Sequence, residues 1–404
     1  MAGINLNFGN LQWTLPGSLT KGIKQISQAQ TGSQLAPSVL VKKSLANPID
    51  YPMLSQALTP DDTVAIAIDD SINQFPALLL ESLKEIHLAG VPYEKIHLVH
   101  ARESEPARWM NSLPKEMNSL QIEQHNPAIK EKLGYLAASQ NGDPVFLNRT
   151  LVETDQVVVI GNRRLHPLLG RAGAETELFP LLSDLDSLSL LEKDPDGKAI
   201  YLDSNPIRAR ALEASWLLGA PYFIQAIEGH GPNLLHVLAG AKEAIFQADN
   251  LLDRTWLKEI SSPVDLVVAC LGDCPGKDLF QEISLAVAFS RGILKPGGSI
   301  ALLCEQQVDI QPIKKYLETK VTKDKTKPGP GQDFFKGSAI RKWVEAATEF
   351  KVHLYCGNSP AQAAQLLAHP LTGVKDLISL VEKASSVLVI PEASKTFVRL
   401  TKKT

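Results

Sequence analysis

The sequence lacks several features that would place it in a specialised class of protein. It has four cysteines in 404 residues, Cys270, Cys274, Cys304 and Cys356, and no two of them form a CxxC pair. Neither a disulfide framework nor a zinc site is therefore indicated, and we expect reduced, buried thiols. No apolar run approaches the ~20 residues that cross a bilayer. The run Val264–Cys270 has the length of a buried strand, so we expect no membrane partner.

The sequence also has no large excess of charge of either sign. Its 41 lysines and arginines against 44 aspartates and glutamates give a net charge of −3. Because a polyanion is gripped by a positive field, we expect no nucleic-acid partner. The first 26 residues show no basic segment followed by an apolar run and a cleavage site, so we expect a cytoplasmic location. A composition of 44% apolar and 21% charged residues is typical of a folded globular chain of two or three domains.

Common catalytic signatures are missing as well. The sequence contains no P-loop, GxSxG or HExxH motif. The segment LKPGGS at residues 294–299 is similar to a turn of methyltransferases that use S-adenosylmethionine. Such enzymes also need a glycine-rich turn after their first strand. Here the strand Val264–Cys270 is followed only by Gly272 and Gly276 among bulkier residues, so we interpret LKPGG as a structural turn.

Short β-branched runs alternate with helical patterns along the chain, which predicts an α/β fold. Strands at residues 63–68 and 95–100 flank a helix at 76–89, and the pattern restarts at Val264–Cys270 after Ser261-Ser262-Pro263. Such alternation is typical of parallel sheets covered by helices. We therefore predict two α/β domains with largely parallel sheets, residues 1–262 and 263–404, facing an interdomain cleft. Residues 320–331, rich in lysine, proline and glycine, are expected to form a surface loop.

Polar residues follow three of the predicted strands. They are Asp69-Asp70-Ser71, residues 102–105, and residues 162–166, which end in His166. Because an open parallel sheet builds its binding crevice at the carboxyl ends of its strands, we expect these loops to converge. Arg102, Arg163, Arg164 and Arg171 lie near the same ends, either as ordinary surface charge or as binding groups.

An ordered series of segments resembles the lactate racemase family. In the first half these are IDDSINQFP (68–76), HNP (125–127), YLAASQNGDPVFLNRTLVETDQVVVIG (135–161), HPLLGRAG (166–173) and NPIRARALEASWLLGAPYFIQAI (205–227). In the second half they are VDLVVACLGDCP (264–275), DLFQ (278–281) and LKPGGSIALLCE (294–305). The similarity runs through most of the chain and is specific for homology and fold.

The resemblance implies two α/β domains around a nickel-pincer nucleotide, which the family attaches through a lysine thioamide. In the family's reaction a histidine takes the hydroxyl proton of a 2-hydroxy acid while hydride passes to the cofactor. A second histidine serves the other enantiomer, an arginine holds the substrate carboxylate, and a third histidine binds nickel. The implied activity is that of a racemase or epimerase of 2-hydroxy acids.

The first substrate-binding positions match only in part. The family's Asp-x-Thr-Arg-Pro turn falls on residues 70–74, so Asp70 is kept and the carboxylate-binding arginine becomes Asn73. A neutral amide cannot form the same charge-assisted fork. The first catalytic histidine falls on Ser104, and His100 would replace it only if the loop were rearranged.

The remaining positions show the same mixture of retained and lost groups. His166 matches the second catalytic histidine, whereas Thr176 stands where the family has the lysine that carries the cofactor. Gln281 matches a cofactor-binding glutamine, and Ser284 replaces a cofactor-binding lysine. No histidine lies between His166 and His230 to bind nickel, so no metal ligand is assigned. Most of the lost positions are catalytic, substrate-binding or cofactor-binding ones, whereas the segments that build the fold are retained.

Three functions follow from these matches. The chain is a racemase or epimerase that holds a nickel-pincer nucleotide non-covalently, or a pincer-free homologue that binds an anionic small molecule in the cleft as a sensor or scaffold. The third alternative is a different enzyme on the same fold, with His166 as a general base and Asp70 orienting it or the substrate. Asp70, Asn73, Ser104, His166, Thr176, Gln281 and Ser284 are the candidate site residues.

Overall fold

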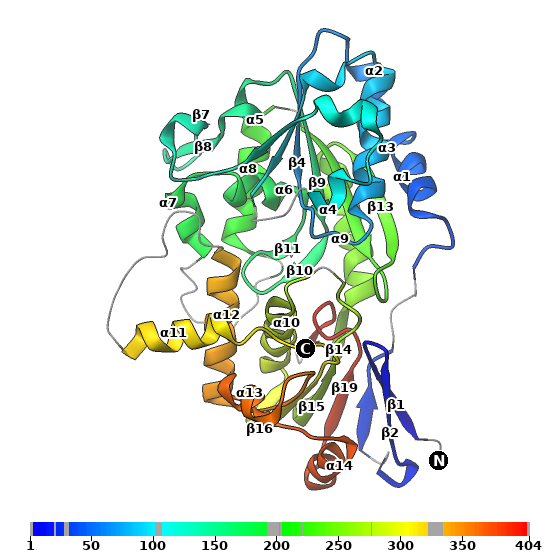
Figure 1. The fold of residues 1–404 in the computed structure, drawn as a ribbon, viewed down its shortest axis with the longest axis vertical. Helices are drawn as coiled ribbons and strands as arrows, with labels where there is room; N and C mark the ends of the chain where they lie inside the picture. The colour runs from blue at the N-terminus through cyan, green and yellow to red at the C-terminus, as the bar shows by residue number, and fades with distance from the viewer. Residues whose placement is uncertain are drawn as a thin grey trace.

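A computed structural model describes most of the chain, with two lobes, each built on one sheet (Figure 1). The residues described are 3–19, 22–27, 32–101, 107–191, 202, 204–219, 221–275, 277–321 and 334–401. The predicted polar loop at 102–105, Ser104 included, and nearly all of the predicted surface loop at 320–331 lie outside them. No helix of the described residues is long and apolar enough to cross a membrane.

The first lobe contains a six-stranded sheet of order β13-β12-β9-β4-β5-β6. Its strands are β4 (Val64–Ile68), β5 (Ile96–His100), β6 (Gln121–Gln124), β9 (Gln156–Asn162), β12 (Tyr222–Glu228) and β13 (Leu234–Gly240). All neighbouring pairs are parallel except β12 and β13. The strand order reverses between β4 and β9, which is the place where open sheets of this kind bind ligands at their carboxyl edge.

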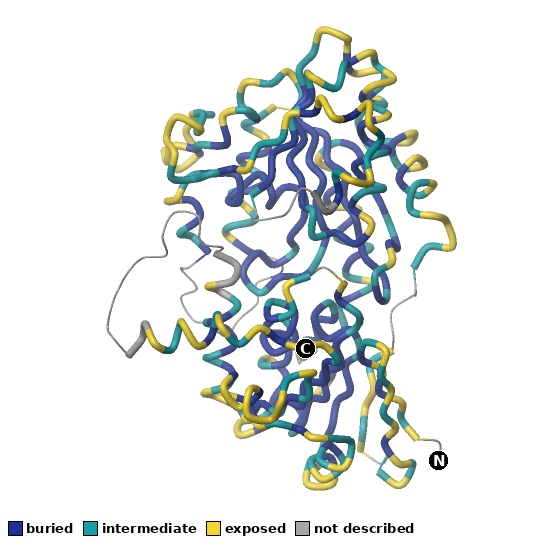
Figure 2. The backbone as a smooth tube through the Cα atoms, in the orientation of Figure 1, coloured by how far each residue is buried: buried dark blue, intermediate teal, exposed yellow. Residues whose placement is uncertain are grey.

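Helices cover both faces of the first sheet. The helices of this lobe are α1 (Pro37–Leu45), α2 (Leu54–Ala57), α3 (Phe75–Leu88), α4 (Ala107–Met110), α5 (Arg149–Glu153), α6 (Ala174–Thr176), α7 (Leu185–Leu188), α8 (Pro206–Leu217) and α9 (Lys242–Trp256). Alternate residues of β4 point to opposite sides, so that Ile66 packs with α1 and α3 while Ala67 packs with α5, α6 and α9. The sheet is therefore buried on both faces, as the continuous apolar strand sequences predict (Figure 2).

The second lobe contains a parallel sheet of order β18-β17-β16-β15-β19-β3. Its strands are β3 (Ile23–Gln25), β15 (Val264–Cys270), β16 (Leu294–Leu303), β17 (Lys351–Tyr355), β18 (His369–Pro370) and β19 (Val387–Ile390). Its helices are α10 (Leu279–Arg291), α11 (Gln311–Val321), α12 (Phe334–Glu349), α13 (Pro360–Gln365) and α14 (Val374–Lys383). The predicted LKPGG turn is a bulge at the start of β16, with Gly297 at φ +77°.

The amino-terminal segment belongs structurally to the second lobe. The hairpin β1 (Ile4–Phe8) and β2 (Leu11–Leu15) buries Leu6, Phe8 and Leu15 against one face of that sheet, and β3 pairs with β19. The opposite face is covered by α10, α12 and α13. The division of the chain at residue 262 stays a prediction, but it omits this return of the amino terminus, which covers one sheet face together with α14.

The lobes meet through an apolar contact and an added strand pair. Leu165, Ile227 and Trp256 of the first lobe pack with Phe289 and Phe397 of the second. Nearby, β14 (Leu257–Ile260) pairs in parallel with β20 (Phe397–Leu400). Two further ribbons, β7 (Leu133–Ala138) with β8 (Pro144–Asn148) and β10 (Arg164–His166) with β11 (Gly170–Ala172), complete the first lobe.

Candidate functional site

The carboxyl edge of the first sheet faces the second lobe and carries most of the predicted site. Asp69 and Asp70 follow β4, residues 163–166 follow β9, and Glu228 ends β12. The Asp69 amide donates to the Ile160 carbonyl at 3.0 Å, which holds the β4 and β9 ends together. Asp69 also receives hydrogen bonds from the amide and hydroxyl of Ser71. The structure thus confirms that two of the predicted polar loops converge at one edge.

His166 is held in one orientation by the short ribbon β10–β11. Its Nδ1 accepts hydrogen bonds from the amides of Leu168 and Leu169 at 3.2 and 3.3 Å, and the residue is 6% exposed. Because backbone N–H groups only donate, Nδ1 is the acceptor, and the proton of the neutral ring is on Nε2. In this tautomer Nε2 is a hydrogen-bond donor, which suits contact with an anionic oxygen rather than removal of a hydroxyl proton.

A hollow between the lobes brings His166 together with two other predicted site residues, Gln281 and Ser284. The described residues that line it are Arg164, His166 and Pro167 from the first lobe and Gln281, Ser284, Leu285, Ala339 and Lys342 from the second. Its position between two lobes is typical of small-molecule sites.

Helix periodicity explains how the second lobe presents its part of the wall. Gln281, Ser284 and Leu285 have spacings of three and four residues on α10, so they share one face, as do Ala339 and Lys342 on α12. Asp278 caps α10 by accepting hydrogen bonds from the amides of Phe280 and Gln281. The Ser284 hydroxyl donates to the Phe280 carbonyl at 2.7 Å, so its hydrogen is already engaged within the helix.

The arginines that follow β9 have different environments. Arg163 is fully buried and pairs with Glu175 and Asp249, while Arg171 pairs with Asp253 at 2.6 Å. Arg164 lines the hollow, and its side chain forms no ion pair or hydrogen bond with any residue in the described part of the chain. Four arginines were considered as binding groups for an anion, and Arg102 lies outside the described residues. Among the other three, Arg164 is the one that forms no ion pair with a described residue.

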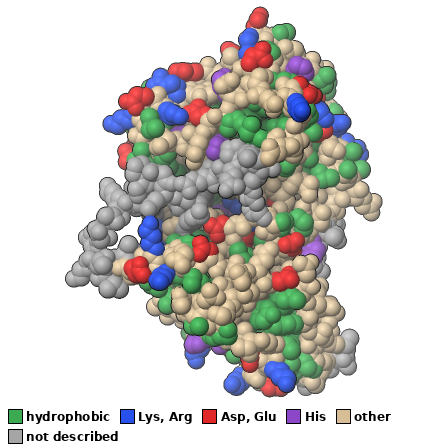
Figure 3. All heavy atoms as spheres, viewed as in Figure 1, with side chains coloured by type: hydrophobic (Ala, Val, Ile, Leu, Met, Phe, Trp, Pro, Cys, Tyr) green, Lys and Arg blue, Asp and Glu red, His purple; other side chains and the backbone are tan. Residues whose placement is uncertain are grey.

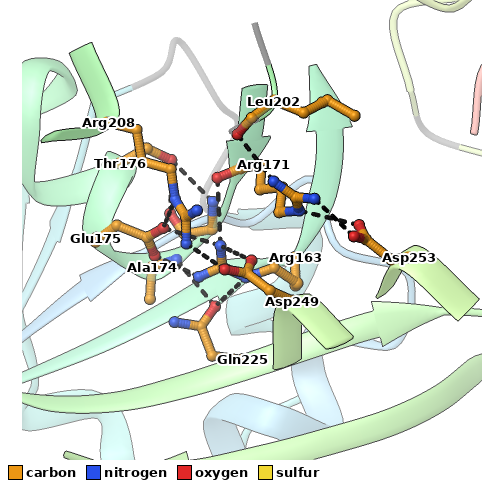
Figure 4. A network of polar contacts seen from close by, with 11 residues as sticks. Arg163, Arg171, Ala174, Glu175, Thr176, Leu202, Arg208, Gln225, Asp249 and Asp253 are labelled. Carbon is orange, nitrogen blue, oxygen red and sulfur yellow. Dashed lines mark hydrogen bonds and ion pairs between the residues drawn. The ribbon is translucent and has the colours of Figure 1, made fainter. Parts of the chain in front are cut away.

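Thr176, at the position of the family's tether lysine, is part of a closed structural unit. Its Oγ1 accepts from the Gly173 amide at 2.9 Å and donates to the Gly173 carbonyl at 2.7 Å, and the residue is 1% exposed. A Cβ on Gly173 would come within 2.4 Å of the Arg163 guanidinium. The turn that contains Thr176 is therefore packed directly against a buried ion pair (Figure 4).

That ion-pair cluster consists of Arg163, Glu175, Arg208 and Asp249. Arg208 Nε lies 3.1 Å from Glu175, and its Nη2 lies 2.5 Å from Asp249. Gln225 adds its side-chain oxygen, which accepts from Arg163 and from the Ala174 amide. Burial raises the pKa of Glu175, but the charge of Arg163 outweighs burial and holds that pKa below its ordinary value. For Asp249 burial prevails, and its pKa is raised.

These residues do not fit the covalently attached cofactor of the family. Thr176 has no amine to form a thioamide, and its hydroxyl is engaged within its own turn. Among the described residues, no group of three or more histidine, cysteine, aspartate or glutamate side chains is placed to hold a metal ion. We therefore derive no chemistry through a tethered nickel centre.

The other predicted residues lie away from the hollow. Asp70 is half-buried just past β4, and Asn73 is buried, with its amide donating to Glu228 at 2.8 Å. Neither is among the described residues that line the hollow, nor is Thr176. His100, the alternative base, is buried at the end of β5. The structure thus groups His166, Gln281 and Ser284 and leaves Asp70, Asn73 and Thr176 outside this group.

Sequence reasoning missed a second polar group, which joins the lobes beside the hollow. Glu228 is fully buried and lies 2.7 Å from Lys277 and 3.8 Å from Lys395. Burial raises the pKa of Glu228, but the two lysines outweigh it and hold the pKa below its ordinary value. Glu392 accepts from His230 at 2.7 Å and from the Gly231 amide. Glu228, Lys277 and Lys395 line a second hollow, which shares Arg164 and Leu285 with the first.

Sequence reasoning also missed Lys342. It lies beside the buried Trp343 on α12 and is 7% exposed. A signal was present, because a lysine three residues after Ala339 and four before Ala346 interrupts an apolar helical stripe. For the Glu228 group no local pattern exists, because its members come from segments up to 167 residues apart in sequence. Figure 3 shows charges of both signs interspersed over one face of the molecule, in agreement with the small net charge.

Comparison with known sequences gives one family match. The family profile described as lactate racemase N-terminal domain matches residues 9–189. No protein of curated description matches the chain. The profile covers β4, β9 and the loop that carries Arg164 and His166.

Comparison with solved structures covers nearly the whole chain. The lactate racemase apoprotein of Thermoanaerobacterium thermosaccharolyticum matches with a TM-score of 0.74 at 17% identity, over 98% of this chain and 100% of that one. A protein of Thermotoga maritima matches with a TM-score of 0.62 at 13% identity, over 92% and 100% of the two chains. At such identities the likeness establishes the fold, and it confirms the two-lobed α/β architecture.

Proposed function

Because the chain is a homologue of the lactate racemase family, we propose that it binds a small carboxylate in the hollow between its lobes without a tethered nickel-pincer cofactor. The observation that carries this proposal is the Arg164 side chain, which lines the hollow beside His166 and forms no ion pair with a residue in the described part of the chain. A half-buried guanidinium whose N–H groups form no ion pair can bind an anion.

The neighbouring groups suit a carboxylate. Arg164 offers parallel N–H donors, and His166 adds its Nε2–H because Nδ1 accepts from the backbone. Gln281, on the opposite wall, brings an amide that can donate or accept, which suits a hydroxyl or carbonyl next to the carboxylate. The ligand then contacts both lobes, so its binding stabilises the arrangement in which they face each other.

The first test compares binding of D- and L-lactate and of glycolate to the wild-type protein and to Arg164→Met, by isothermal titration calorimetry. Loss of a charge-assisted pair lowers affinity by roughly 10- to 100-fold. Arg210→Met is the matched control, because Arg210 is a surface residue 3.6 Å from Asp143 and should leave affinity unchanged. Equal affinity of wild type and Arg164→Met would remove the basis of the proposal.

A second test separates the donor role of His166 from a base role. His166→Ala should lower carboxylate affinity by about 3- to 10-fold, because one hydrogen bond is lost, and the fold should remain intact. If His166 is instead a general base, any turnover found with the wild type will disappear in this variant while affinity stays the same. The two outcomes are read from the same protein by calorimetry and by chiral chromatography of the products.

The competing candidate is a racemase or epimerase that holds the nickel-pincer nucleotide non-covalently. The observation in its favour is that Gln281 and Ser284, aligned with cofactor-binding positions of the family, line the same hollow as His166. Elemental analysis after co-production with the pincer-synthesis enzymes decides between the two. Near-stoichiometric nickel, beside a loaded lactate racemase as reference, would favour this candidate over a cofactor-free binding protein.

A further inference from the structure

The second hollow, which adjoins the first, is lined by charges of both signs, and most of them are paired. Arg163 belongs to the buried ion-pair cluster of the first lobe. Lys277 lies 2.7 Å from Glu228, and Lys395 lies 3.3 Å from Glu392. These side chains are therefore already engaged within the protein.

Two charges of this wall remain, and they have opposite signs. Arg164 comes from β10 and Glu282 from α10, and neither side chain forms an ion pair or a hydrogen bond with a described residue. Glu282 is nevertheless 6% exposed. Burial lowers the pKa of Lys277, and the carboxylates of Glu228 and Glu282 outweigh burial, so that this pKa is raised. Glu282 therefore acts on Lys277 from beyond ion-pair distance, while the direct partner of Lys277 is Glu228.

Two neutral polar side chains of the same wall are also buried. Asn162, at the end of β9, is 4% exposed, and Ser394, which follows β19, is 5% exposed. Neither side chain hydrogen-bonds to a described residue. Their polar atoms are not among the described side-chain atoms that are sealed in the interior without a partner, so they reach the space of the hollow. Because buried polar groups are normally hydrogen-bonded, these side chains are suited to bind a polar ligand.

These groups match a ligand that carries both charges. An ammonium group has three N–H donors, and Glu282, Asn162 and Ser394 offer oxygens that accept. A carboxylate forms a charge-assisted pair with a guanidinium. From the placement of Arg164 and Glu282 in one wall, we infer that the ligand is a small amino acid, with its carboxylate at Arg164 and its ammonium group at Glu282.

The inference rests on the proposed function and narrows its ligand class. Arg164 lines both hollows, so a carboxylate bound there stays on the side of His166 while the ammonium group extends into the second hollow. A buried carboxylate without a direct partner costs free energy, and the ammonium group of the ligand offsets that cost.

The discriminating experiment is calorimetry at pH 7 and one fixed ionic strength with paired probes. The pairs are alanine with lactate, glycine with glycolate, and β-alanine with 3-hydroxypropionate, so that an ammonium group replaces a hydroxyl. We expect at least one amino acid to bind about 10-fold or more tightly than its hydroxy-acid partner, because a charge-assisted hydrogen bond to Glu282 is added. Comparison of glycine with β-alanine then reports which separation of the two charges fits better.

Glu282→Gln tests where the ammonium group binds. It removes the charge and keeps the size of the side chain, and an unfolding curve shows whether the variant is folded. The folded variant should lose the preference for the amino acid and keep the affinity for the hydroxy acid. Glu382→Gln is the control, because Glu382 is an exposed carboxylate of the same lobe outside both hollows, and it should keep the preference.

Ser394→Ala is a milder variant that removes one acceptor from the same wall. It should lower the affinity for the amino acid about 3-fold and leave the affinity for the hydroxy acid unchanged, because one hydrogen bond to the ammonium group is lost. If Glu282→Gln does not fold, an unchanged preference in Ser394→Ala overturns the assignment of the ammonium site.

The outcomes separate this inference from the proposed function. If every amino acid binds no more tightly than its hydroxy-acid partner, the amino-acid inference is overturned while carboxylate binding at Arg164 stands. If amino acids are preferred and folded Glu282→Gln keeps that preference, the assignment of Glu282 is overturned. If none of the probes binds, both the inference and the proposed function fall.

Discussion

Arg163 and Arg164 are neighbours in sequence with opposite environments. Arg163 turns into the first lobe, where Glu175 and Asp249 neutralise it and Gln225 accepts from its Nε. Arg164 turns into the hollow between the lobes and forms no ion pair with a residue in the described ranges. The comparison teaches that a buried charge which is fully paired serves the fold, whereas a charge left unpaired at a cleft is available to a ligand.

The ion pairs around Glu228 share one feature with each of these two arginines, because they are buried like Arg163 and lie between the lobes like Arg164. Glu228 is as buried as the Arg163 cluster, yet its partners Lys277 and Lys395 come from the other lobe. Its ion pairs therefore hold the lobes together beside the candidate site. Variants in the three regions should differ in stability in a definite order.

The largest effect is expected in the Arg163 cluster. Glu175→Gln leaves the buried guanidinium of Arg163 without its main counter-charge, so the free energy of unfolding should fall by about 3–5 kcal/mol. Urea unfolding followed by circular dichroism measures this change. Glu259→Gln is the matched control, since Glu259 pairs with Arg399 on the surface and should cost less than about 1 kcal/mol. Similar losses in the two variants would contradict the structural role of the cluster.

The next effect concerns Glu228 and depends on pH. Glu228→Gln should cost about 2–3 kcal/mol at pH 7, because a charged hydrogen bond to Lys277 is lost. The folded-state pKa of Glu228 lies below its ordinary value of 4.5. Its contribution is therefore fully present above pH 4.5 and is lost as the pH falls through the folded-state pKa.

Unfolding measured from pH 7 down to pH 3 tests this sign. The difference in stability between wild type and Glu228→Gln should shrink as the pH falls below 4.5. A difference that grows on acidification would mean that the ion pair with Lys277 does not stabilise the charged form of Glu228.

A smaller effect is expected at the tether position. Thr176→Lys places a long side chain in a site that is 1% exposed, so stability should fall by about 1–3 kcal/mol through overpacking. Lactate racemisation should not appear, because the variant still lacks the carboxylate-binding arginine at Asn73, the first catalytic histidine at Ser104 and the nickel-binding histidine. Chiral chromatography of lactate after co-production with the pincer-synthesis enzymes checks this. Thr176→Ser, which keeps the hydroxyl, should remain close to wild type in stability.

The smallest effect on stability is expected at Arg164. Arg164→Met removes a charge that forms no ion pair with a described residue, so the free energy of unfolding should change by no more than about 0.5 kcal/mol. The same variant should lose carboxylate binding, and this separation of stability from affinity is the sharpest test of the comparison with Arg163. A large loss of stability would show that Arg164 also serves the fold.

Most of the fold could be predicted from the sequence because apolar periodicity and turn residues act locally. The predicted strand Val264–Cys270 has the observed bounds, and the helix predicted at 76–89 is Phe75–Leu88. The amino-terminal hairpin was missed, because its short strands are stabilised by a sheet more than 240 residues away. Strand β12 was missed as well, although its sequence, YFIQAIE, is mostly apolar like those of the neighbouring strands.

The candidate site was only partly predictable. The alignment of His166, Gln281 and Ser284 with family positions places them in one site, and the structure brings these three together. Which arginine faces the hollow could not be predicted, because Arg163, Arg164 and Arg171 have the same chemistry and differ only in their neighbours. Lys342 was missed because a single lysine in an apolar stripe does not show which element it faces.

The sequence by itself determined the α/β alternation, the family resemblance and the replacement of the tether lysine by Thr176, because each of these is a property of residue order. Tertiary structure decided which charges are neutralised, because Arg163 meets Asp249 across 86 residues and Glu228 meets Lys277 across 49. Electrostatic energy depends on distance and burial in space, not on position along the chain. For that reason Arg164, His166 and Gln281 could be recognised as a candidate site only once the two lobes were placed face to face.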